Sequence, residues 1–158
     1  MLFLLFQIED DRYALESRQI VEVLPLLDVK AIPQAPEGVS GILNYHGTPV
    51  PLIDLRLLAM KSPSRRRVTT RIVLVNHIDS TGEPHLLGIL AEGVTDTLRR
   101  AESDFVDSGV TAEQAPYLGR VTTDSRGIIQ WVQINHLLPP GVLVNLFCQL
   151  RSQANGDN

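Results

Sequence analysis

The chain contains little cysteine, few aromatic residues and no excess of positive charge. Cys148 is its single cysteine, which excludes an intrachain disulfide and a cluster of thiolate metal ligands and is compatible with a reducing cytoplasm. Aromatic residues make up 5% of the 158 residues, too few for a base-stacking platform. The net charge of −4 argues against nucleic-acid binding, because phosphate contacts need clustered Lys and Arg.

Long apolar runs are also missing. No run approaches the roughly 18 apolar residues that a membrane helix needs. The apolar segment 1–8 lacks the basic region and the cleavage site of a signal peptide, and it continues directly into the acidic residues 9–11. We therefore expect it to be a buried first strand that ends in a polar turn.

Many short apolar segments separated by Gly, Pro and polar turns make up most of the chain, which at this length suits one domain. Segment 41–55 reads as two short strands around a turn at Gly47. Segment 16–23 fits either a helical turn or the start of a strand. A bulge or a sharp bend is expected at Gly88 and Gly93. Further strands are predicted at 2–8, 12–15, 26–32, 70–77, 86–98, 117–121 and 128–134, and short helices at 56–61 and 143–150.

The chain resembles itself across its middle. Segment 13–24 matches 87–98, and segment 47–58 matches 127–138. Short strands at this spacing are typical of β-sandwiches and small barrels. Two related halves predict two small barrels side by side that share a buried interface, since one barrel of some five strands has little core of its own.

Residues capable of catalysis or metal binding occur without a recognisable motif. The chain has no nucleophile elbow, phosphate loop or dinucleotide fingerprint, and its four histidines are not at metal-ligand spacing. Asp54 is interpreted as the cap of a helix that starts near Leu55 rather than as a catalytic carboxylate. We predict no catalytic residue, metal or cofactor. A small hydrolase or metal enzyme would need at least three of these residues to converge: His46, His77, His85, His136, Asp54 and Asp104.

Three other features allow two interpretations each. The run Arg65–Arg67 could dock an acidic partner, although such a run is more often a solvated loop. Trp131 and Tyr117 could be interface anchors or core residues. Cys148, in an apolar terminal stretch, is expected to be buried.

Segment 41–55, GILNYHGTPVPLIDL, resembles the central signature of the CheW-like family of chemotaxis coupling proteins, usually of the form G-x-x-N-L-R-G-x-x-x-P-V-x-D-L. Segments 6–23, 72–75, 87–94 and 117–119 resemble other parts of that family, so that the resemblance extends over about residues 2–150. It implies an all-β fold with a few short helices, built from two intertwined five-stranded SH3-like barrels. One domain would span residues 1–150, followed by a disordered tail at 151–158.

The resemblance also implies a non-enzymatic, cytoplasmic adaptor associated with membrane-bound receptor arrays. Such a protein bridges the cytoplasmic tips of chemoreceptors (methyl-accepting chemotaxis proteins) and the regulatory domain of a CheA-type histidine kinase. Val29 and Ile32 would contact the kinase. Ile20, Val23 and Ile72 would bury apolar receptor side chains, and Glu22 and His46 would orient the receptor. The whole receptor groove, between the barrels, would consist of Ile20, Glu22, Val23, Asn44, His46 and Ile72.

One departure from the family signature concerns the receptor. Tyr45 and His46 replace the usual Leu-Arg, and His is mostly uncharged near neutral pH whereas Arg is a fixed cation. This fits a member of an alternative chemosensory system better than a flagellar one. An SH3-like scaffold that binds another peptide or protein outside chemotaxis is the alternative.

Overall fold

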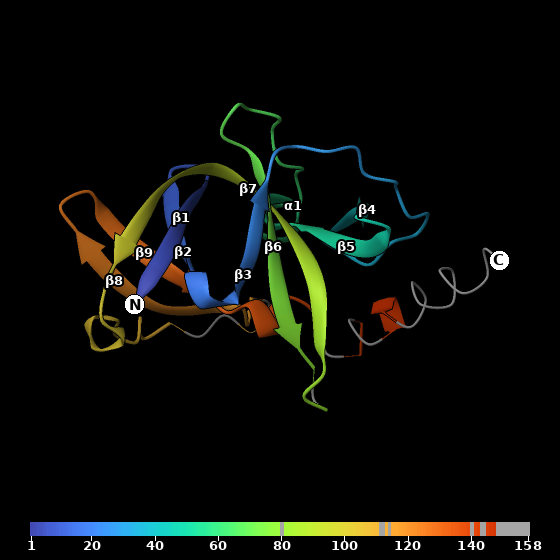
Figure 1. Ribbon diagram of the computed structural model, residues 1–158. Coiled ribbons are helices and arrows are strands. Elements are labelled where there is room, and N and C mark those ends of the chain that lie inside the picture. Colours follow the sequence, from blue (N-terminus) through green and yellow to red (C-terminus); the bar gives the residue numbers. More distant parts are fainter. Residues whose placement is uncertain (80, 111–112, 114, 140, 143–144, 148–158) are drawn as a thin grey trace.

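The computed structural model describes residues 1–79, 81–110, 113, 115–139, 141–142 and 145–147. Within these residues nine strands form one connected sheet system, together with the α-helix α1, three short 3₁₀ helices and further helical residues at 141–142 and 145–147 (Figure 1). The elements are β1 (Leu2–Ile8), β2 (Asp11–Glu16), η1 (Ser17–Gln19), β3 (Ile20–Leu24), β4 (Val39–Tyr45), β5 (Thr48–Asp54), α1 (Leu55–Met60), β6 (Arg71–Ile78), β7 (Pro84–Arg99), η2 (Glu102–Asp104), β8 (Leu118–Asp124), β9 (Gly127–Val132) and η3 (Ile134–His136).

The strands form two SH3-like barrels that share β7. Barrel 1 consists of β3, β4, β5, β6 and the first half of β7, which pairs with β6 from Pro84 to Ala91 and runs parallel to β5. Barrel 2 consists of β1, β2, β8, β9 and the second half of β7, which pairs with β1 from Glu92 to Arg99. Figure 1 shows β7 passing from one barrel into the other. The predicted fold class is confirmed.

The internal repeat does not assign one barrel to each half of the chain. The first half gives β1 and β2 to barrel 2 and β3 to β5 to barrel 1, whereas the second half gives β6 to barrel 1 and β8 and β9 to barrel 2. The parallel pairs β5–β7 and β2–β9 occupy equivalent places in the two barrels. Each half therefore crosses between the barrels, and that crossing makes them intertwined.

The crossing of β7 depends on one of its two glycines. Gly93 has a φ of +63°, and the β1–β7 register shifts beside it, between the pairs of Leu5 and Gln7. The predicted bend at Gly93 is confirmed. The predicted bend at Gly88 is wrong, because Gly88 lies in the regular part of the β6–β7 ladder. A Cβ there would lie 2.9 Å from Cδ1 of Leu52, so close packing rather than a bend accounts for this glycine.

Strand β6 shows how the core is divided. Its alternate residues face opposite sides of the strand, and both sides are buried, which explains the unbroken apolar run from Ile72 to Val75. Ile72 and Leu74 pack in barrel 1, whereas Val73 and Val75 pack in a core shared with Phe6 of barrel 2. The barrels therefore bury a common interface, as predicted.

Barrel 2 has an aromatic core. Phe3 packs edge-on against Trp131, with ring centroids 4.9 Å apart, and Phe105 lies 5.0 Å from the same indole. Trp131 and Tyr117 are 6% and 4% exposed, which makes both of them core residues rather than interface anchors.

Three predicted segments had a different outcome: one is wrong, one contains both of its alternatives, and one lies partly outside the described residues. The strand predicted at 26–32 is wrong, because only Lys30 makes a bridge there, to Ile42. Segment 16–23 contains both of its alternatives, first η1 and then β3. Of the terminal helix predicted at 143–150, residues 145–147 are helical, while Cys148 and the tail at 151–158 lie outside the described residues.

No helix in the described residues is both long and apolar enough to cross a membrane.

Candidate protein-interaction site

Asp54 ends β5 and caps α1. Its Oδ1 accepts hydrogen bonds from the backbone N–H groups of Arg56 (3.1 Å) and Leu57 (3.2 Å) and from the Ser64 hydroxyl (2.5 Å). Its Oδ2 accepts from the Ser64 N–H (2.8 Å), and the side chain is 1% exposed. The predicted capping role is confirmed: the carboxylate anchors the helix and the loop 62–70.

The residues proposed for a hydrolase or metal enzyme do not converge. In the described part of the chain, the one group of three possible metal ligands within 4.8 Å of one another is Asp79, Glu83 and His85. His85 is the only one of the six candidates in that group, and it is the cross-strand partner of His77. His85 Nε2 lies 2.8 Å from Asp79 Oδ2, a hydrogen bond at a hairpin turn.

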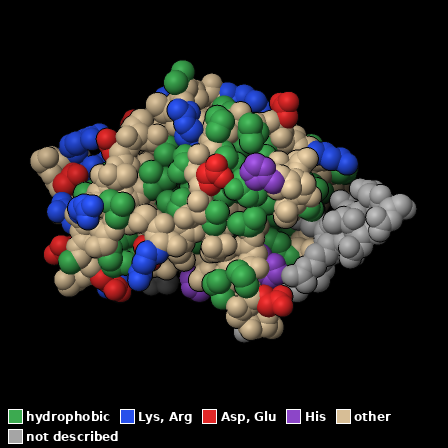
Figure 2. Space-filling view, in the orientation of Figure 1, with side chains coloured by type: hydrophobic (Ala, Val, Ile, Leu, Met, Phe, Trp, Pro, Cys, Tyr) green, Lys and Arg blue, Asp and Glu red, His purple; other side chains and the backbone are tan. Residues whose placement is uncertain are grey.

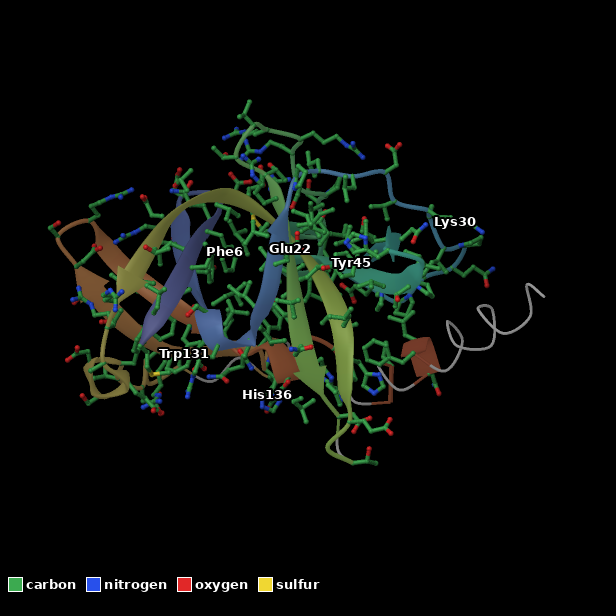
Figure 3. All side chains as sticks on the ribbon, in the orientation of Figure 1. Phe6, Glu22, Lys30, Tyr45, Trp131 and His136 are labelled. Carbon is green, nitrogen blue, oxygen red and sulfur yellow. The ribbon has the colours of Figure 1, made fainter. Side chains whose placement is uncertain are left out.

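An apolar strip is exposed along β3. This strand lies at one end of the sheet order and pairs with β6, which leaves its other edge free in the described chain. Val21 and Val23 are 45% and 42% exposed, and Glu22 between them is exposed as well. Figure 2 shows hydrophobic side chains around an acidic group in the middle of this face, where Figure 3 labels Glu22.

Tyr45 holds Glu22 in place. Its phenol donates a 2.5 Å hydrogen bond to Glu22 Oε2, and Figure 3 shows the two side chains pointing toward each other from β4 and β3. This hydrogen bond raises the pKa of the Tyr45 phenol. His46 follows at the β4–β5 turn with a left-handed φ of 50°, and its ring packs edge-on against Tyr45 at 4.5 Å. We call Val21, Glu22, Val23, Tyr45 and His46 the β3 surface.

Some of the residues expected in a receptor groove are placed for contact, and others are not. Glu22, Val23 and His46 are exposed on the β3 surface. Asn44 is exposed too, but its Oδ1 accepts the Gly47 N–H at 2.8 Å and shapes the turn. Ile20 is half-buried against the shared core.

The expected contact through Ile72 does not fit this geometry. Ile72 is 0% exposed and packs inside barrel 1 with Leu52 and Leu74, so its side chain is not part of the β3 surface. A cleft of about 790 Å³ does exist between α1 and the segment after β9. None of the expected groove residues is among those that line it: Pro36, Glu37, Leu58, Lys61, Glu113, Pro116, Tyr117, Asn135, His136, Leu137, Leu138, Pro139 and Val142.

Val21 and Tyr45 were missed as site residues. Val21 belongs to an apolar run in which every second residue would normally be buried, but it lies where the β3–β6 register shifts, between Ile20 and Glu22, on a strand at the edge of the sheet. Tyr45 stands out in the sequence as a departure from the family signature. Its partner is 23 residues away, however, and the fold alone brings the two together.

The expected kinase residues lie in the irregular segment between β3 and β4. Val29 and Ile32 are both half-buried. Ile32 packs against the shared core, whereas Val29 packs against the barrel 1 core and lines a pocket there.

A network of charged residues links α1 and the loop 62–70 to the β1–β2 turn and to β7. Arg56 of α1 hydrogen-bonds Glu9, in the β1–β2 turn, through Nε at 3.1 Å, and its Nε lies 3.6 Å from Oε2 of buried Glu92 in β7. Arg65 donates to the other Glu92 oxygen at 3.1 Å. The hydrogen bond from Arg56 lowers the pKa of Glu9. This network holds the β1–β2 turn of barrel 2 against barrel 1.

Comparison with known proteins identifies one family. The family model described as CheW-like domain matches residues 2–140. Among curated relatives, the chemotaxis protein CheW of Helicobacter pylori is 28% identical over 102 residues, which cover 65% of this chain and 59% of that protein. The Klebsiella aerogenes CheW is 27% identical over 96 residues, or 61% of this chain and 55% of that protein. The alignments thus span less than two thirds of these relatives.

A solved structure supports the fold. The scaffolding protein TtCheW from Thermoanaerobacter tengcongensis superimposes with a TM-score of 0.75 at 21% sequence identity, covering 87% of each chain. At this identity the likeness shows the fold.

Proposed function

The chain belongs to the CheW-like family, and on that premise we propose that it is a non-enzymatic adaptor coupling chemoreceptors to a CheA-type histidine kinase. The observation that carries the proposal is the β3 surface, where Val21 and Val23 expose apolar side chains on either side of a carboxylate that Tyr45 orients. Two exposed valines on an edge strand, on either side of Glu22, form an apolar patch that a partner protein can bury. The adaptor would act in the cytoplasm, at membrane-bound receptor arrays, as a single domain of residues 1–150.

We assign the β3 surface to the chemoreceptor tip. A helical hairpin can lay an apolar stripe on Val21 and Val23, the helix-in-groove mode of recognition. Glu22 and His46 then orient it with one carboxylate and one imidazole. Because His46 stands where the family signature has Arg, the surface offers the receptor the Glu22 carboxylate without a fixed guanidinium beside it. That difference supports a receptor of an alternative chemosensory system.

The regulatory domain of the kinase is assigned to the segment between β3 and β4, through Val29 and Ile32. The two partners would then contact different faces of barrel 1. A rigid body is needed to keep their spacing constant, and the Arg56 network together with the shared core supplies it.

The test is binding to purified partners encoded in the same genome: a receptor cytoplasmic fragment and the kinase regulatory domain, each measured by biolayer interferometry. Val23→Asp and Val21→Asp should each weaken receptor binding at least about tenfold, because a carboxylate is then buried unpaired, and should leave kinase binding unchanged. Val110→Asp is the matched control, since Val110 is 77% exposed and lies between η2 and β8, outside the β3 surface. Wild-type protein that binds neither partner would refute the adaptor function.

A second function is favoured by the free edge of β3. An extended peptide could add a strand there, as in β-augmentation, which would make the protein an SH3-like scaffold outside chemotaxis. Comparing helical receptor-tip fragments with extended peptides of the same sequence separates the two. Binding that requires the helical form supports the adaptor.

A further inference from the structure

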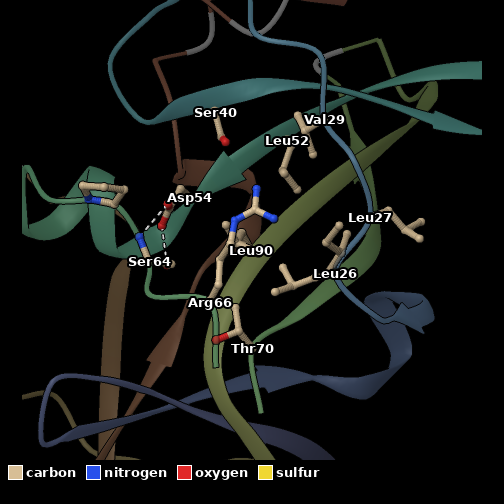
Figure 4. Close-up of a pocket in the computed structure, with 12 residues that line it drawn as sticks. Leu26, Leu27, Val29, Ser40, Leu52, Asp54, Ser64, Arg66, Thr70 and Leu90 are labelled. Atoms are coloured by element: carbon tan, nitrogen blue, oxygen red, sulfur yellow. Dashed lines mark hydrogen bonds between the residues drawn. The ribbon is translucent and has the colours of Figure 1, made fainter. Parts of the chain in front are cut away.

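A pocket opens in barrel 1 next to the loop 62–70 (Figure 4). Its apolar lining includes Leu26, Leu27, Val29, Leu52, Ile72 and Leu90. Its volume is about 130 Å³. An engineered apolar cavity of roughly 150 Å³ holds one benzene ring. The barrel 1 pocket therefore has room for one apolar side chain, not for a helix or a strand.

Most polar groups at the other end of the pocket already have partners. Both oxygens of Asp54 are occupied by the cap of α1 and by Ser64. The Thr70 hydroxyl donates to the carbonyl of Arg65 (2.6 Å) and accepts the N–H of Arg67 (3.2 Å). These bonds hold the loop in shape and leave little to offer a ligand.

Arg66 is different. Its guanidinium takes part in no hydrogen bond or ion pair with the described residues, whereas neighbouring Arg65 pairs with Glu92. Figure 4 shows the Arg66 side chain extending over the pocket. An unpaired cation beside an apolar pocket is complementary to an apolar side chain with a carboxylate next to it.

We propose that the barrel 1 pocket takes an apolar side chain of the kinase regulatory domain, and that Arg66 pairs with an acidic residue beside it. The inference rests on the proposed adaptor function. Val29, one of the residues assigned to the kinase, lines the pocket, and the residues of the β3 surface do not. The run Arg65–Arg67, followed by Arg71, adds a local positive potential to a chain of net charge −4, which favours an acidic patch on the partner.

The contact separates into a charge part and an apolar part. Exposed charges at the edge of an interface change mainly the association rate, whereas a desolvated pair also changes the dissociation rate. Arg66→Glu should raise the dissociation rate of the kinase domain at least about tenfold. Arg67→Glu makes the same charge change one residue away, outside the pocket lining. It should slow association somewhat and leave the dissociation rate within about twofold of wild type.

The apolar part is tested at the wall of the pocket. Leu27→Asp places a carboxylate in that wall and should weaken kinase binding at least about tenfold. Val110→Asp, at a position that is 77% exposed, lies between η2 and β8 and does not line the pocket, is the control. Leu27→Ser is a milder second variant, and a thermal melt of each variant verifies that it folds. Both Leu27 variants should retain wild-type affinity for the receptor fragment.

The outcomes distinguish this inference from the function on which it rests. If the wild-type protein binds the kinase domain and Arg66→Glu leaves the dissociation rate unchanged, the proposed ion pair is wrong. If both Leu27 variants bind the kinase domain with wild-type affinity, the proposed occupation of the pocket is wrong. Restoration of Arg66→Glu binding by one acidic-to-lysine change on the kinase domain would identify the paired residue. Wild-type protein that fails to bind the kinase overturns the adaptor function and this inference together.

Discussion

Replacing Asp54 with Ala is expected to lower the free energy of unfolding. The change removes the N-cap of α1, worth about 1 kcal/mol. It also removes the charge-assisted bonds to Ser64 that anchor the loop 62–70, worth about 2 kcal/mol. Because the carboxylate is 1% exposed, water replaces these bonds poorly. The expected loss is about 3 kcal/mol of unfolding free energy, or a melting temperature lower by roughly 6–12 °C.

Urea and thermal unfolding followed by circular dichroism measure this loss. Asp54→Ser retains a capping oxygen and should recover the helix contribution, about 1 kcal/mol, but not the loop contribution. Asp28→Ala is the control, since Asp28 is exposed between β3 and β4. A change of less than about 0.5 kcal/mol in Asp54→Ala would refute the capping argument. A gain in stability would point instead to a strained functional carboxylate.

Three further predictions concern pH and backbone geometry. The hydrogen bond from Arg12 holds the Asp124 pKa well below its usual range, so its stabilisation is complete above about pH 4 and is lost as pH falls further; Asp124→Asn should flatten the decline in melting temperature in acid. Burial, followed by nearby His85, lowers the pKa of His77, so the unfolded chain takes up a proton more readily; stability should fall as pH drops below about 6.5, and His77→Gln but not His136→Gln should remove that slope. Gly41→Ala should cost at least about 2 kcal/mol in urea unfolding, because its Cβ would lie 2.3 Å from the carbonyl oxygen of Lys30. Gly47→Ala, with open space and only a φ of +87° to strain it, should cost about 1 kcal/mol.

Local signals in the sequence predicted local structure well. Asp54 precedes an apolar helix start, and both its cap and α1 follow from neighbouring residues alone. The hairpins at 41–55 and 117–134 have turn residues between apolar runs, and both form. Segment 26–32 has the same apolar character, but it lies between Pro25 and Pro33 and makes one bridge. Val29 and Ile32 pack on the cores without a ladder, whereas Leu27 is 39% exposed, so apolarity there did not indicate strand pairing.

The interaction site was harder to predict because exposure is a property of the fold. Ile72 and Val23 are both β-branched and apolar. Ile72 begins an unbroken apolar run and Val23 follows Glu22, but this difference does not say how far each side chain is covered. Strand β6 is covered on both faces, whereas β3 lies at an edge, so one residue is fully buried and the other is 42% exposed. The bond between Glu22 and Tyr45 likewise depends on two strands meeting across 23 residues. A sequence repeat cannot reveal that each half crosses between barrels, because the crossing lies in the connections.

The shared strand β7 has a consequence for how the chain is synthesised. Barrel 1 is contiguous from Ile20 to Ala91, so all its strands leave the ribosome in one stretch. Barrel 2 joins the two ends of the chain: Ala14 in β2 is the register partner of Trp131 in β9. At roughly 5–20 residues per second, Trp131 follows Ala14 by on the order of ten seconds. Strands β6 and β7 can cover one side of the first hairpin earlier, but the core of Phe3, Leu5 and Ala14 stays incomplete until Ile129 and Trp131 are made, so barrel 2 is the last part of the fold to close during translation.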